Sequence, residues 1–180
     1  LRALEPNSVQ AEELRLLTRD HHRLTRDKTR LLNQLTITLK EYYVRPLEVF
    51  PDLETNIMLD FLKQYPTPQA LSKLTRRQWN RFTKREHHMG EERCKELWEK
   101  LNRPQPQVPE HVVRAKARLM GVLVAQLEPL RDAVGSYEQR VKSFFGSMPA
   151  ARLVKGLPGA KTGTIVATLW AELGDAKNRW

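Results

Sequence analysis

Two stretches of this chain carry side chains at the alternating three- and four-residue intervals of a coiled coil. The first comprises Leu14, Leu17, His21, Leu24, Lys28, Leu31, Leu35, Thr38 and Tyr42. The second comprises Met120, Leu123, Leu127, Leu130, Val134, Tyr137, Val141 and Phe144. This spacing puts each set on one face of a long helix, and two such faces bury one another. We therefore expect two long helices that run antiparallel, because the segment between them returns the chain.

Leucine and valine dominate the expected contact between these helices, which we call the seam: Leu17, Leu24, Leu31, Leu35, Leu123, Leu127, Leu130, Val134 and Val141. The polar residues His21 and Lys28 lower stability at such positions but favour one register. Pro129 removes a backbone donor from the second helix and predicts a kink there. The alternative is that both stripes are core faces of a compact bundle. The expected boundaries place the first long helix in residues 1–50 and the second in residues 110–148.

Residues 51–109 carry helix start and stop signals at short intervals, which predict a small helical insert. Asp52 is placed to cap one helix, and Thr75 followed by Gln78 is a capping-box pattern that opens another. Gly90 separates that helix from the next one. The insert ends in an extended connector that cannot be helical, because it contains Pro104, Pro106 and Pro109.

Basic side chains outnumber acidic ones. The 31 Lys and Arg residues against 21 Asp and Glu give a formal net charge of +10 at pH 7, which favours polyanions such as DNA or RNA as partners. One expected helix of the insert carries Arg76, Arg77, Arg81, Lys84 and Arg85, with Trp79, Phe82 and Met89 on its opposite side. This pattern predicts a helix that contacts phosphates while its aromatic rings lie in the core. The alternative is a basic face that meets only solvent.

The first long helix admits a similar pair of interpretations. Its arginines are Arg15, Arg19, Arg23, Arg26 and Arg30, and they fit either contact with nucleic acid or the charged flank of a coiled coil.

Near its end the chain reads as a helix, a glycine turn and a second helix. Pro158 and Gly159 break the first helix, and Gly163 opens the next. Exposed N–H groups and the positive end of a helix dipole can then bind a phosphate. The expected contacts are Lys155, Gly159, Lys161, Thr162 and Gly163. The segment resembles a helix-hairpin-helix, although Lys161 and Ile165 depart from its pattern, and the alternative is a helix pair that contacts only its own core.

Several kinds of chemistry are not predicted. Adjacent histidines on a helix point about 100° apart, so His21 with His22, and His87 with His88, do not make metal sites. The scattered serines and carboxylates suggest no catalytic group. The single Cys94 fits a reducing, cytoplasmic compartment. The sequence contains no run of about 18 apolar residues, so it predicts no membrane-spanning helix.

The order of the motifs is similar to the middle of bacterial insertion-sequence transposases of family one-ten, the RNA-guided, bridge-RNA recombinases. The resemblance rests on Glu13–Arg19, Arg23 with Leu24, Thr29, Asn33–Leu35, Leu39, Phe50 with Pro51, Tyr65–Pro68, Leu157–Gly159, Ala171–Asp175 and Trp180. It implies a RuvC-like front domain with a Mg²⁺-binding carboxylate quartet, a central coiled coil, and a rear transposase domain with a nucleophilic serine. We expect this chain to start after the quartet and to stop before the serine, with residues 149–180 beginning the rear domain.

The resemblance implies a fragment that assembles protomers into a dimer or tetramer and binds DNA and structured guide RNA during transposition. It implies no catalytic residue and no cofactor in this segment, although the parent enzyme is expected to use Mg²⁺. The expected fold is all-α: an elongated antiparallel coiled coil with a small helical insert and a C-terminal helix-hairpin-helix-like segment. Two alternatives remain open, a helical protein-interaction adaptor with no nucleic-acid role and a helix-hairpin-helix DNA-repair protein.

Overall fold

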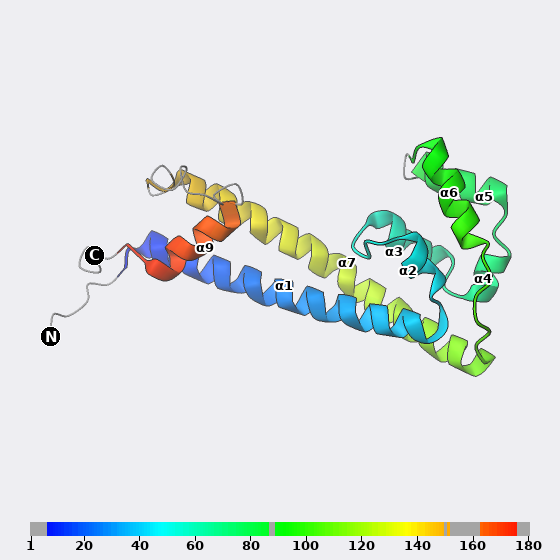
Figure 1. The fold of residues 1–180 in the computed structure, drawn as a ribbon. Coiled ribbons are helices and arrows are strands. Elements are labelled where there is room, and N and C mark those ends of the chain that lie inside the picture. The colour runs from blue at the N-terminus through cyan, green and yellow to red at the C-terminus, as the bar shows by residue number, and fades with distance from the viewer. Residues whose placement is uncertain (1–6, 87–88, 150, 152–162, 176–180) are drawn as a thin grey trace. The chain divides into compact units, whose positions relative to one another are not determined.

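The computed structural model describes residues 7–86, 89–149, 151 and 163–175, and these contain helices and no strand. The all-α class is therefore confirmed for the described part of the chain. The helices, traced in Figure 1, are α1 (Val9–Tyr42), α2 (Arg45–Val49), α3 (Asn56–Gln64), α4 (Pro68–Ser72), α5 (Arg76–Asn80), the π-helical η1 (Arg81–Glu86), α6 (Glu91–Leu101), α7 (Glu110–Ser147) and α9 (Gly163–Leu173).

The chain divides into two compact units. The first unit combines residues 1–28 with residues 130–180, and the second comprises residues 29–129. The two long helices α1 and α7 each contribute to both units. Each unit has its own cluster of buried side chains and is described by itself below.

In the first unit α9 packs against the beginning of α1 and the end of α7. The core contains Leu14 from α1, Val141 and Phe145 from α7, and Val166 and Ala167 from α9. Its two long helices run antiparallel (Figure 1), and Glu13 near the start of α1 lies 3.7 Å from Arg140 near the end of α7.

Polar contacts also hold α9 to α1 in this unit. The Arg19 guanidinium contacts Glu172 through hydrogen bonds of 3.0 and 3.1 Å. The Asp175 carboxylate accepts a hydrogen bond from the Ser8 backbone N–H at 2.9 Å. Because Ser8 Oγ in turn accepts from the Ala11 N–H, Asp175 reinforces the N-terminal cap of α1.

In the second unit the insert packs on the other halves of the long helices. Its core joins Leu35 and Leu39 of α1 to Leu123 and Leu127 of α7. It includes Phe50, which follows α2, and the aromatic side chains Phe61, Trp79 and Phe82 of the insert. α1 and α7 run antiparallel here as well (Figure 1), and Glu41 near the end of α1 forms an ion pair with Lys116 near the start of α7. The stripe on α1 is thus a helix-helix contact and also part of a bundle core in this unit.

All residues expected in the seam are buried or half-buried: Leu17, Leu24, Leu31 and Leu130 are half-buried, and Leu35, Leu123, Leu127, Val134 and Val141 are buried. α7 begins at Glu110 and continues as one helix through Pro129. The helix therefore tolerates the loss of the backbone hydrogen bond that Pro129 cannot donate.

Of the two helix caps predicted in the insert, one is confirmed and the other is wrong. The capping box of Thr75 and Gln78 is present at the start of α5. The expected cap at Asp52 is wrong, because α3 begins only at Asn56 and the Asp52 carboxylate instead accepts from the Glu54 N–H at 2.8 Å. An aspartate accepting a backbone N–H two residues on forms a turn rather than a helix start.

Candidate nucleic-acid interface

The apolar side of α5 and η1 is anchored in the core of the second unit. Trp79 and Phe82 are at most 1 % exposed, and the Trp79 indole N–H donates to the Cys94 carbonyl at 2.9 Å. The Thr83 hydroxyl donates to the Trp79 carbonyl, also at 2.9 Å. The wider π-helical turn lets the consecutive residues Phe82 and Thr83 both lie in the core. The helix that carries the basic residues is therefore held firmly.

The basic side of the same helix faces solvent. Arg77 and Arg81 are exposed, and neither has an ion-pair or hydrogen-bond partner among the described residues. Arg76 stacks its guanidinium over the Trp98 ring, 5.3 Å from the centroid. Lys84 lies 3.7 Å from Glu91. The side chain of the fifth predicted contact, Arg85, lies outside the described residues.

In the adjacent helix α6 the basic side chains form ion pairs with glutamates of the same helix. Arg93 contacts Glu96 at 2.6 Å, and Lys100 contacts the same carboxylate at 2.7 Å. Lys95 lies 3.5 Å from Glu92. The pKa of Glu96 is held below its usual value by its hydrogen bonds to Lys100 and Arg93. The basic charge of α6 is thus neutralised within the helix, whereas that of Arg77 and Arg81 is not.

The arginines of α1 fall into two groups. Arg15 contacts Glu12 at 2.6 Å, and Arg19 contacts Glu172. Arg23, Arg26 and Arg30 are exposed and have no partner among the described residues. Arg23 and Arg26 belong to the first unit and Arg30 to the second. Each unit therefore presents unpaired arginines from this helix.

The structure tests the glycine turn only at its end. Lys155, Gly159, Lys161 and Thr162 lie outside the described residues. Gly163 is the first residue of α9, and a Cβ added to it would lie 3.6 Å from Lys142 Cγ, an ordinary contact. Packing among the described residues therefore does not require glycine at position 163.

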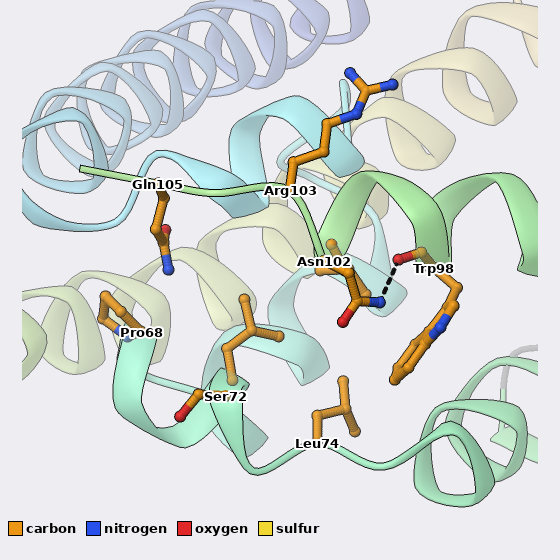
Figure 2. Close-up of a pocket in the computed structure, with 9 residues that line it drawn as sticks. Pro68, Ser72, Leu74, Trp98, Asn102, Arg103 and Gln105 are labelled. Carbon is orange, nitrogen blue, oxygen red and sulfur yellow. Dashed lines mark hydrogen bonds between the residues drawn. The ribbon is translucent and has the colours of Figure 1, made fainter. Parts of the chain in front are cut away.

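Two adjoining cavities in the second unit were not predicted from the sequence. The first, of about 300 Å³, is lined by Pro68, Leu71, Ser72, Leu74, Trp98, Leu101, Asn102, Arg103 and Gln105. The second, of about 370 Å³, shares Pro68, Ser72 and Gln105 with the first. Figure 2 shows the Trp98 ring extending from α6 toward Leu74, while the Arg103 side chain points away from the other labelled residues.

Arg45 fixes the connector that forms one wall of these cavities. Its side chain is buried, and Nη2 donates to the carbonyl oxygens of Arg103 at 2.8 Å and Pro104 at 2.6 Å. Nη1 donates to Glu48. Prolines deprive the connector of helical hydrogen bonds, so these contacts from α2 define its path. No local signal at Arg45 could have revealed a partner so distant in sequence.

The first unit contains a third hollow, of about 440 Å³. It is lined by His21, His22, Thr25, Lys28, Val134, Glu138, Thr164, Ile165, Thr168 and Leu169. Burial, followed by the nearby charge of His22, lowers the pKa of His21.

Within the described ranges, no group of three or more His, Cys, Asp or Glu side chains is arranged to hold a metal ion. Among the described residues, no helix is both long and apolar enough to span a membrane.

Comparisons with protein-family models, curated proteins and solved structures find no match to this chain. The feature that the geometry defines best is a firmly anchored helix with two arginines that have no partner among the described residues. It lies beside a cavity whose lining side chains are neutral apart from Arg103, which points away from the other labelled residues.

Proposed function

We propose that this chain is a nucleic-acid-binding and assembly segment of a DNA transposase or recombinase. The observation that carries the nucleic-acid part is the contrast between α5–η1 and α6. Arg77 and Arg81 are exposed without a carboxylate partner among the described residues, while the cations of α6 are paired. A guanidinium without an internal partner can bind a phosphate without first giving up an ion pair.

The spacing of these arginines supports the same proposal. Arg77 and Arg81 are four positions apart, which places neighbouring side chains on one side of a helical segment. Their backbone is anchored by the buried Trp79 and Phe82. Two cations on a rigid support can contact phosphates of one strand with little loss of conformational entropy.

The transposase part of the proposal rests on the order of motifs that resembles family one-ten. In such a protein the paired long helices would space and join protomers into a dimer or tetramer. The basic insert would bind DNA or structured guide RNA. Catalysis would belong to residues outside this segment, with Mg²⁺ as the cofactor of the parent enzyme and the cytoplasm as its compartment.

A protein-interaction adaptor is the second candidate, and one observation favours it. The helix α9 is apolar on more than its buried side, since Ile165 is 56 % exposed, Leu169 59 % and Leu173 46 %. These residues recur every four positions and form an exposed stripe on α9. Such a stripe is typical of a helix that packs against a further protein surface.

The nucleic-acid proposal is tested by titrating labelled duplex DNA and structured RNA at several salt concentrations. The test variant is Arg77→Gln/Arg81→Gln. The matched control is Arg93→Gln/Lys95→Gln, which removes the same charge from exposed but paired positions. If each arginine contacts one phosphate, the slope of log affinity against log salt falls by about 2 in the test variant. We expect the control to keep a slope close to that of the unchanged protein.

Two results would count against this function. If the protein fails to bind either polymer at low salt, the adaptor is favoured instead. If both double variants weaken binding equally, only the net charge matters, and α5–η1 is not an interface.

A further inference from the structure

The cavity shown in Figure 2 has the chemistry of a pocket for a neutral, planar, hydrogen-bonding group. Its apolar walls come from leucines and from the half-buried Trp98. Asn102 and Gln105 contribute side-chain amides, each of which offers both donors and an acceptor. Among the described residues, no carboxylate lines this cavity or the adjoining one.

The amides have capacity left for a ligand. Asn102 Nδ2 donates to the Trp98 carbonyl at 2.7 Å, a contact marked in Figure 2. Its Oδ1 has no partner among the described residues, and neither does the amide of Gln105. Gln105 is only half-buried, so a ligand in the cavity can reach it. The Ser72 hydroxyl donates to the Gln69 carbonyl at 2.9 Å, so Ser72 Oγ can still accept a hydrogen bond from a ligand.

The surroundings of the cavity favour a ligand that carries negative charge outside the neutral group. Lys73 directly follows the lining residue Ser72 and is exposed, with no partner among the described residues. Arg76 lies over the Trp98 ring, and Arg77 is next to it on α5. A neutral pocket beside cations matches a nucleotide, whose base is uncharged and whose phosphate is anionic.

We propose that this cavity binds one unstacked nucleobase of a single-stranded or looped nucleic acid. The base packs against Trp98 and the leucines while Asn102 and Gln105 hydrogen-bond to its edge. The neighbouring phosphates meet Lys73 and Arg77. A volume of about 300 Å³ suits one small ring system rather than a stacked pair. The adjoining cavity shares Pro68 and Ser72 with the first one, and it would hold the next part of the bound nucleic-acid strand. This inference rests on the proposed nucleic-acid function and specifies which form of the polymer the insert recognises.

The test compares two probes of equal length and charge, using the full chain. One is a fluorescently labelled ten-residue oligodeoxythymidine, and the other is the same strand with abasic sites in place of its bases. A bound base adds stacking and hydrogen bonds to the phosphate contacts, so we expect the base-containing strand to bind about tenfold more tightly. An oligouridine of the same length shows whether RNA is accepted equally.

The variant Asn102→Leu/Gln105→Met removes both amides with little change in volume. It should abolish the preference for the base-containing strand and leave the affinity for the abasic strand unchanged. Gln105→Met alone breaks no hydrogen bond among the described residues, and it should reduce the preference even if the double variant folds poorly. The control Asn33→Leu/Gln126→Met removes two exposed amides of the same unit that do not line the cavity. It should keep the preference intact.

Equal binding of the abasic and base-containing strands, with a steep salt dependence, would overturn the base pocket while leaving the proposed function standing. No binding of any strand at low salt would overturn both. A preference that persists in Gln105→Met and in the double variant would also overturn the pocket. So would tight binding of a proline-rich ten-residue peptide that Gln105→Met abolishes without affecting either strand, because the cavity would then be a peptide site.

Discussion

Replacing Arg45 with methionine tests whether one buried guanidinium holds the insert together. Arg45 is 4 % exposed and bridges α2 to the connector through the carbonyls of Arg103 and Pro104. Methionine fills a similar volume but donates no hydrogen bond. The substitution therefore removes the bridge and leaves two carbonyl oxygens to find new partners.

The expected loss follows from the contacts. Hydrogen bonds from a charged donor contribute about 1.5–3 kcal/mol each, so two of them give roughly 3–6 kcal/mol. Removing the charge also removes the cost of keeping a guanidinium away from water, which lowers the net loss to about 2–3 kcal/mol. The partner Glu48 is half exposed, so its pairing adds little. For a chain of this size, such a loss lowers the melting temperature by about 5–10 °C.

Thermal unfolding followed by circular dichroism, together with urea titration, measures this change. The matched control is Arg103→Met, because Arg103 contributes only its carbonyl to the bridge and its own side chain is exposed. We expect that control to stay within about 0.5 kcal/mol of the unchanged protein. A melting temperature of Arg45→Met that matches the control would refute the reasoning. A fully stable Arg45→Lys variant would show that the forked geometry of arginine is unnecessary.

Four further predictions concern individual side chains. Tyr42→Phe should destabilise the protein by about 1 kcal/mol, because its hydroxyl donates to the Pro66 carbonyl at 2.9 Å. By contrast, Tyr43→Phe should be neutral or stabilising in urea titration, because the buried Tyr43 hydroxyl has no hydrogen-bond partner among the described residues. Burial lowers the pKa of His21 below its ordinary 6.5, so stability should fall as the pH drops through that value, and His21→Gln should lessen the fall. Leu24→Glu and Leu127→Glu should each reduce helicity or change the oligomeric state in solution, since each places a charge in the seam.

The long helices were predictable because the heptad stripes are a local, repeated signal. α7 spans Glu110–Ser147, close to the expected range of 110–148. The capping box at Thr75 was equally predictable, since its partner Gln78 lies three residues away. Burial of Trp79 followed from its place opposite the arginines on one helix. In each case the interacting residues are close in sequence or follow a regular period.

The parts that escaped sequence analysis depend on contacts between distant segments. Arg45 looks like any surface arginine until the carbonyls of Arg103 and Pro104 are brought to it, 58 and 59 residues further on. The cavity that Asn102 and Gln105 line is likewise formed with residues distant in sequence, such as Pro68 and Leu71. Asp52 had a plausible cap pattern, but its carboxylate accepts a nearer N–H and forms a turn. Short polar side chains often have such competing partners, so their sequence signal is ambiguous.

The distribution of basic charge matters more for function than its total. A formal net charge of +10 would attract any polyanion weakly, wherever the lysines and arginines lay. α6 nevertheless pairs each of its cations with a glutamate. In the part of the chain that the structure describes, Arg77 and Arg81 of α5–η1 have no such partner, although their backbone is anchored. If only total charge mattered, removing two cations from either helix would cost the same affinity. Because ion pairs already satisfy the cations of α6, only the α5–η1 variants should lose phosphate contacts, and the slope against salt is the quantity that separates these two cases.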